Sequence, residues 1–139
     1  MPADPAMPRV LFACGTNSGR TQMAQAFFRM FTQGRVTALS AVIERTTEPE
    51  PTVIKAMAEA NADLTDCDPV LLTPHIAASA DYVVAMNCVI DGLIHVDADW
   101  KIADPAGKTL DEVRGVRDAI REASATLSER ILAAVRPAN

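Results

Sequence analysis

One cysteine in this sequence is placed where it could act as a nucleophile. Cys14 directly follows the apolar run Val10 to Ala13, and Arg20 comes six positions later, after small and turn-forming residues. The apolar run predicts a short buried strand, and the residues from Arg20 onward favour a helix. Unpaired N–H groups at a helix start and the guanidinium fork of an arginine both bind oxyanions. A thiol in such surroundings ionises readily, so we expect a Cys14 thiolate at the floor of an oxyanion cradle.

The predicted cradle is the loop that joins this strand to this helix. Gly15 and Gly19 permit backbone conformations that other residues avoid, which lets a loop turn its N–H groups inward. The residues expected to bind the oxyanion are Gly15, Thr16, Asn17, Ser18, Gly19, Arg20 and Thr21. A nucleotide-binding P-loop is excluded. The two glycines of a P-loop are separated by four residues and followed by lysine, and Gly15, Gly19 and Arg20 do not match that pattern. A cysteine that only fills the core remains the alternative for Cys14.

Asp104 is the second residue with a chemical interpretation. It precedes Pro105, and a proline restricts the preceding backbone to extended conformations. A carboxyl group aimed in this way could donate a proton to a leaving oxygen. Asp-Pro also opens many ordinary turns, so the residue types alone leave both interpretations open.

The remaining cysteines and histidines carry weaker signals. Cys88 follows an apolar run and is either reactive or core filling. Cys67 lies between two aspartates, which disfavour a thiolate, so we expect it to be unreactive. His75 and His95 have no metal-ligand spacing with the cysteines. The sequence therefore predicts no metal site and no bound cofactor.

Alternating strand and helix patterns predict the elements that position these residues. The expected strands are Val10–Ala13, Val36–Val42, Tyr82–Met86 and a fourth at either Leu93–Val96 or Trp100–Ala103. The expected helices are Arg20–Gln33, Pro51–Ala60, Pro69–Ala78 interrupted at Pro74, and Thr109–Val135, the last with a capping box between Thr109 and Glu112. The alternation predicts an α/β fold with a four-stranded parallel sheet and helices on both faces. Ligands bind at the carboxyl ends of such strands, so Cys14, Cys88 and Asp104 should lie along one edge.

Length and composition predict one domain. The 139 residues are 49% hydrophobic, enough for one core over residues 1–139, with residues 1–8 as a flexible tail. A net charge of −5 argues against nucleic acid as a partner. No apolar run reaches the length of a membrane span, and the start carries no export signal, so we expect a cytoplasmic protein without a membrane partner.

The residues around Cys14 carry a resemblance to a known family. Cysteine, five residues, then Arg20 and Thr21 resemble the signature loop of cysteine-based phosphatases. The preceding strand, the position near the N-terminus and the following Gln22-Met23-Ala24 look like the low-molecular-weight protein tyrosine phosphatase superfamily, which includes arsenate reductases. This resemblance covers nearly the whole chain. It implies that Cys14 is the nucleophile, that Arg20 binds the oxyanion and that Asp104 is the general acid.

The residues after Pro105 separate the two branches of this superfamily. Tyrosine phosphatases of this kind place aromatic residues there, whereas this chain has Ala106-Gly107-Lys108 and only 4% aromatic residues. The resemblance therefore implies reduction of arsenate to arsenite through a Cys14 thiol–arsenate adduct, with an external thiol or a thioredoxin-like protein as reductant. Phosphomonoester hydrolysis by a tyrosine phosphatase is the first alternative. A protein that binds a small oxyanion such as phosphate without turnover is the second.

Cys88 stands where the thioredoxin-coupled reductases have the first of two further redox cysteines. The second should follow within several residues, but the segment from Val89 to His95 contains no cysteine. Cys88 is thus either a resolving cysteine whose disulfide an outside thiol opens, or a packing residue.

Overall fold

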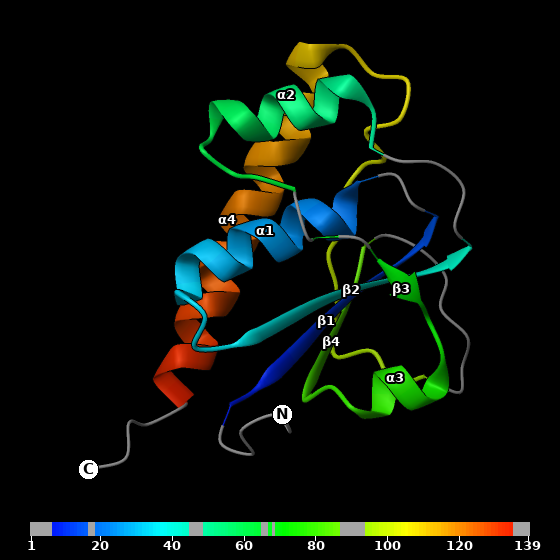
Figure 1. Cartoon of the computed structure of the whole chain (residues 1–139), viewed down its shortest axis with the longest axis vertical. Helices are drawn as coiled ribbons and strands as arrows, with labels where there is room; N and C mark the ends of the chain where they lie inside the picture. The colour runs from blue at the N-terminus through cyan, green and yellow to red at the C-terminus, as the bar shows by residue number, and fades with distance from the viewer. Residues whose placement is uncertain are drawn as a thin grey trace.

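The computed structural model describes residues 7–16, 19–44, 49–64, 67, 69–86 and 94–134. Strands and helices alternate along the chain, as Figure 1 shows. The strands are β1 (Arg9–Thr16), β2 (Thr37–Glu44), β3 (Val70–Leu71), β4 (Tyr82–Ala85) and β5 (Ala98–Asp99). The helices are α1 (Arg20–Thr32), α2 (Pro51–Glu59), α3 (Pro74–Ala78) and α4 (Leu110–Ala134). The predicted α/β class with one parallel sheet is confirmed.

The sheet has five strands in the order β3-β2-β1-β4-β5, all parallel, whereas the sequence predicted four. The additional strand β3 lies within the segment predicted as a helix from Pro69, and the observed helix there begins only at Pro74. The last strand, Ala98–Asp99, lies between the two ranges expected for it. Both edge strands are two residues long. They form because a neighbouring strand offers hydrogen bonds, and so few residues carry no periodic pattern.

Strand β1 continues three residues beyond the predicted end at Ala13. Its pairing with β4 does stop there, since Ala13 opposite Ala85 is the last pair. Pairing with β2 continues through Cys14 and ends with Thr16 opposite Glu44. Cys14 therefore lies one residue beyond the last pair of β1 with β4, at the carboxyl edge of the sheet.

Helices cover the two faces of the sheet unequally. Helices α1, α2 and α4 pack on one face, where the larger core includes Phe12 of β1, Met23 of α1 and Ile120 of α4. The other face carries the five-residue helix α3 and a smaller core that includes Leu11 and Val83. Alternate residues of β1 thus serve different cores, as expected for a strand buried on both sides.

The ends of the two long helices follow their sequence signals. Thr109 and Glu112 form the predicted capping box, with Glu112 N–H donating to Thr109 Oγ1 at 3.2 Å and Thr109 N–H donating to Glu112 Oε1 at 3.0 Å. The hydrogen bonds that Thr109 donates to the Glu112 carboxylate lower the pKa of Glu112. Helix α1 ends where Gln33 and Gly34 adopt positive φ angles of 52° and 77°. Among the described residues, no helix combines the length and apolarity needed to cross a membrane.

Candidate functional site

Cys14 is held at the carboxyl edge of the sheet, on the face covered by the three larger helices. Its side chain is 1% exposed and belongs to the larger core. Its Sγ lies 3.8 Å from the carbonyl oxygen of Met86, the residue that follows β4. The carboxyl-terminal end of β1 and the chain after β4 therefore meet at the sulfur, as parallel topology requires.

Gly19 starts helix α1 in a conformation that favours glycine. Its φ is +100°, and its carbonyl accepts from Met23 N–H at 2.8 Å. A Cβ built on Gly19 would lie 3.1 Å from Val53 Cγ1 and 3.7 Å from Pro49 Cβ. The start of α2 therefore packs directly against Gly19 of the predicted cradle, and both φ and space favour glycine there.

Arg20 turns its guanidinium back onto Cys14. The side chain is 6% exposed, and Nη2 donates to Cys14 Sγ at 3.0 Å while Nη1 donates to Ile102 O at 3.1 Å. A guanidinium that donates to sulfur stabilises the thiolate, which is the nucleophilic form. The spacing of five residues predicted this meeting of Cys14 and Arg20.

Other residues predicted for the cradle are described only in part. Gly15 is half-buried in β1 and Thr21 is buried in the first turn of α1. The backbone of Thr16 pairs opposite Glu44 of β2. Asn17, Ser18 and Cys88 lie outside the described residues, so their predicted roles remain predictions.

Asp104 lies in the exposed segment between β5 and α4. Its Oδ1 accepts from Ala106 N–H at 2.9 Å, which forms a local turn around Pro105. Ile102, two residues earlier, gives its carbonyl to Arg20. The segment that carries Asp104, the predicted general acid, is thus hydrogen-bonded to Arg20, which lies beside the predicted nucleophile Cys14. The sequence offered no signal for this link, since a backbone carbonyl accepts it.

The aromatic side chains pack in the larger core or against it. Phe12, Phe27 and Phe28 are fully buried in the core. Trp100 packs on Phe12 with ring centroids 5.5 Å apart, and it lines a hollow of about 400 Å³ together with Tyr82. Tyr82 pairs with Val10 near the amino end of β1, the edge of the sheet opposite Cys14.

Phe31 completes this set of four phenylalanines, one tryptophan and one tyrosine. It stacks on Phe27 in the last turns of α1, with ring centroids 5.9 Å apart. The turn after Asp104 carries Ala106, Gly107 and Lys108, so none of these aromatic side chains comes from it.

A buried polar network between α1 and β2 was not predicted from the sequence. Gln25 Nε2 donates to Ala38 O at 2.9 Å, and Ser40 Oγ donates to Gln25 Oε1 at 2.9 Å. Both side chains are almost fully buried. These bonds tie α1 to β2 and fix the helix whose first turn carries Arg20, since buried polar groups stabilise when satisfied. Glutamine in a helix interior gives no sequence signal for such a role.

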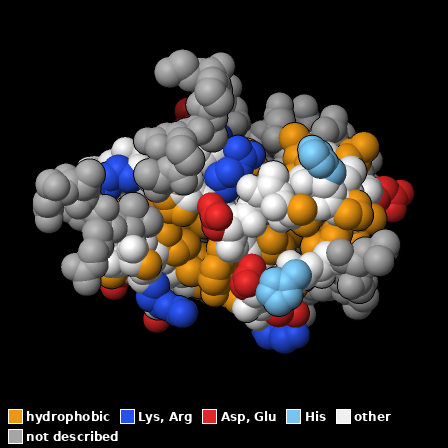
Figure 2. All heavy atoms as spheres, turned by 90° about the horizontal axis from the view of Figure 1, so that it is seen from below, with side chains coloured by type: hydrophobic (Ala, Val, Ile, Leu, Met, Phe, Trp, Pro, Cys, Tyr) orange, Lys and Arg blue, Asp and Glu red, His pale blue; other side chains and the backbone are white. Residues whose placement is uncertain are grey.

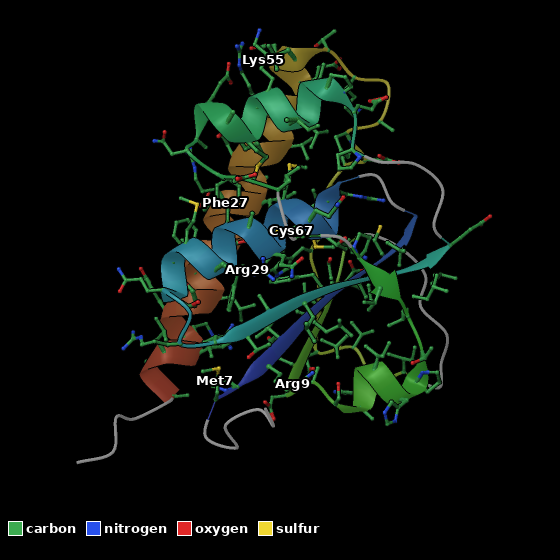
Figure 3. All side chains as sticks on the ribbon, viewed as in Figure 1. Met7, Arg9, Phe27, Arg29, Lys55 and Cys67 are labelled. Atoms are coloured by element: carbon green, nitrogen blue, oxygen red, sulfur yellow. The ribbon has the colours of Figure 1, made fainter. Side chains whose placement is uncertain are left out.

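Cys67 is the other described cysteine, and it too contacts an arginine of α1. The side chain is 1% exposed, and Arg29 Nη1 donates to its Sγ at 3.6 Å (Figure 3). The sequence predicted an unreactive thiol from the flanking aspartates, which lie outside the described residues. The arginine contact adds a positive charge that the sequence did not predict.

No group of metal-binding side chains is found in the described part of the chain. The two histidines stand apart on the face seen in Figure 2. His95 Nε2 lies 3.1 Å from Asp97 Oδ1 at an exposed site.

Comparisons with known proteins indicate the family of the chain. Residues 9–97 match the family model described as low molecular weight phosphotyrosine protein phosphatase. The chain is 36% identical over 126 residues to an arsenate reductase of Bacillus cereus, covering 86% of this chain and 93% of that protein. It is 33% identical over 128 residues to arsenate reductase 1 of Staphylococcus epidermidis, covering 88% and 96%.

A solved structure is similar as well. An arsenate reductase in the phosphate binding state superposes with a TM-score of 0.76 at 28% identity, covering 90% of this chain and 99% of that one.

Proposed function

The chain belongs to the low molecular weight phosphotyrosine protein phosphatase family, and we propose that it reduces arsenate to arsenite through an adduct on Cys14. One observation carries this choice over phosphotyrosine hydrolysis: the turn after Asp104 carries Ala106, Gly107 and Lys108, so it offers no aromatic side chain. A phenyl ring would lack the stacking surface that aromatic side chains give, whereas a bare oxyanion needs only donors and charge. The relatives named arsenate reductase support the same choice.

In the first step, the Cys14 thiolate attacks arsenic and an As–S bond forms. A hydroxyl of arsenate accepts a proton from Asp104 and leaves as water. Arg20, whose Nη2 already lies 3.0 Å from Sγ, turns donors toward the arsenate oxygens and stabilises their charge. The cradle N–H groups from Gly15 to Gly19 do the same.

In the second step, another thiolate attacks Cys14 Sγ. A disulfide forms, the As–S bond breaks, and its electron pair reduces arsenic from the +5 to the +3 state, which releases arsenite. The attacking thiol is either Cys88 or an external thiol. An external thiol or a thioredoxin-like protein then restores Cys14 by thiol–disulfide exchange. This scheme needs no bound cofactor and no metal ion.

The substrate and the compartment belong to the same proposal. A small tetrahedral oxyanion is the ligand, and the related reductase in its phosphate binding state supports this class. We place the reaction in the cytoplasm, where thiols are kept reduced.

The deciding experiment is product analysis of arsenate incubated with the protein and a panel of thiol donors. We expect arsenite from the native protein and from Cys67→Ser, and none above background from Cys14→Ser. Turnover that survives in Cys14→Ser would overturn the assignment. Strong hydrolysis of a phosphotyrosine peptide without arsenite production would reverse the ranking of substrates. Arsenate binding in a calorimeter without turnover under any reductant would instead indicate a binding protein.

Cys88 has a separate test. After a single turnover with arsenate, mass mapping should find Cys14 bonded to Cys88 if Cys88 resolves the adduct, and Cys88→Ala should then lose turnover. Full turnover by Cys88→Ala with a small thiol would exclude the relay and leave the external thiol as the direct partner of Cys14.

A further inference from the structure

Glu50 joins the start of α2 to the segment that carries Asp104. Its Oε1 accepts from Gly107 N–H at 2.8 Å, across 57 positions of sequence. Figure 1 shows the yellow segment that precedes α4 beside the amino-terminal end of α2. No motif in the sequence predicted this contact, since the donor is a backbone group.

Glu50 is itself fixed in place by the helix that follows. Its carbonyl accepts from Val53 N–H at 2.9 Å and from Ile54 N–H at 3.1 Å, because it is the residue that caps α2. The neighbouring Pro49 and Val53 approach Gly19 closely. A side chain at position 50 is therefore held by the same packing that forms the back of the cradle.

The receiving segment is fixed by burial at only one residue of the turn. Pro105 is buried, whereas Asp104, Ala106 and Gly107 are exposed, so burial leaves the Ala106–Gly107 part of the turn unfixed. Its described hydrogen bonds run from Ala106 N–H to Asp104 Oδ1 at 2.9 Å and from Lys108 N–H to Pro105 O at 3.2 Å. Both bonds lie within the turn, and neither sets where the turn stands relative to Cys14.

Two contacts do set that position, one on each side of Asp104. On the amino-terminal side, Ile102 O accepts from Arg20 at 3.1 Å. On the carboxyl-terminal side, Gly107 N–H donates to Glu50. We propose that Glu50 is a positioning residue that holds the Ala106–Gly107 turn so that Asp104 faces the group leaving from Cys14. This inference rests on the proposed function, in which Asp104 is the general acid.

The test compares three variants in a single-turnover measurement of adduct formation on Cys14 at saturating arsenate. We expect Glu50→Ala to slow the rate about tenfold with little change in the arsenate concentration needed for half-saturation, as is usual for residues that orient a reacting group. Glu50→Gln keeps an oxygen acceptor and should restore most of the rate. Glu59→Gln, which alters a carboxylate at the other end of α2, is the matched control and should match the native rate.

A double variant separates this inference from the proposed function. Asp104→Asn should slow adduct formation by about 100-fold or more, and adding Glu50→Ala should then slow it no further. An equal tenfold loss in the Asp104→Asn background would overturn the role of Glu50 and leave the general acid intact. An Asp104→Asn variant with the native rate would overturn the general acid, and with it the premise of this inference.

Amide hydrogen exchange gives a readout that does not depend on turnover. Exchange at Ala106 and Gly107 should accelerate in Glu50→Ala and remain near native in Glu50→Gln. Unchanged exchange in Glu50→Ala would show that Glu50 does not hold the turn and would overturn the inference, whatever the protein does with arsenate.

Discussion

The two ends of helix α1 carry the same three residue types and differ in what surrounds them. At the amino-terminal end, Arg20 donates to Cys14 and Gly19 has a φ of +100°. At the carboxyl-terminal end, Arg29 donates to Cys67 and Gly34 has a φ of +77°. Both sulfurs are 1% exposed. An arginine beside a buried cysteine is therefore not sufficient to define a nucleophile.

The difference lies in the direction of the helix and in how firmly each arginine is held. The amino-terminal end presents unpaired N–H groups and partial positive charge, whereas the last turn presents carbonyls and partial negative charge. Arg20 is buried and has a second acceptor in Ile102 O, at 3.1 Å. Arg29 is exposed, and its distance to sulfur is 3.6 Å rather than 3.0 Å. An oxyanion would be stabilised at the first end and opposed by the helix dipole at the second.

Exchanging each arginine for lysine should give the largest contrast between the two ends. Arg20→Lys loses the planar fork, so we expect turnover of arsenate to fall by about 100- to 1000-fold. Arg29→Lys should stay within about twofold of the native rate, because it contacts no group in the proposed reaction. Steady-state kinetics measures both turnover rates, under conditions in which the two variants are equally stable. Equal losses of turnover in the two variants would contradict the difference between the ends.

Alkylation of the thiols sharpens the comparison without any turnover. Iodoacetate should label Cys14 faster than Cys67 by a factor of about ten or more, because thiolates react and Cys14 has the stronger positive surroundings. Phosphate should slow labelling of Cys14 and leave Cys67 unchanged. Peptide mapping after timed labelling gives both rates. Equal rates, or phosphate protection of Cys67, would contradict the difference between the ends.

Replacing each glycine by alanine compares the backbone at the two ends. Positive φ costs an L-residue about 1–2 kcal/mol relative to glycine, and both variants should lose about that much unfolding free energy. Gly19→Ala should lose more than Gly34→Ala, since its Cβ would lie 3.1 Å from Val53 Cγ1 and that of Gly34 meets nothing within 4 Å. Urea unfolding curves measure the difference. A larger loss in Gly34→Ala would contradict the close approach of α2 to the cradle.

The smallest expected effect concerns an arginine whose partner is a carboxylate, away from both ends of α1. Arg114 donates to Glu59 at 2.9 and 2.8 Å, and these bonds lower the pKa of Glu59 from 4.5 to about 2. Because the folded pKa is depressed, this contribution to stability is present above pH 4.5 and is lost as the pH falls toward 2. The melting temperature of Glu59→Gln should lie slightly below native at pH 7, and the difference should shrink through that window. A constant difference from pH 7 to pH 2 would exclude the ion pair as its cause.

The order of strands and helices follows from local pattern, because the β1 and β4 runs and the three longer helices each carry enough residues to show a period. The meeting of Cys14 and Arg20 was predictable for the same reason, since only five residues separate them in the sequence. The capping box of Thr109 and Glu112 is also a local signal, and it formed as expected. These features depend on residues that are close in sequence.

Other features were decided only by the tertiary structure. The two-residue strands β3 and β5 form because a neighbouring strand supplies partners, so no run of their own residues marks them. Ile102 and Gly107 form their hydrogen bonds through backbone groups, which every residue type has, so the sequence could not predict them. The pairing of Gln25 with Ser40 joins a helix to a strand through side chains that usually lie at the surface. The sequence by itself determined which residues could attack an oxyanion, and the fold determined which contacts hold them in place, because those contacts join segments far apart in the chain.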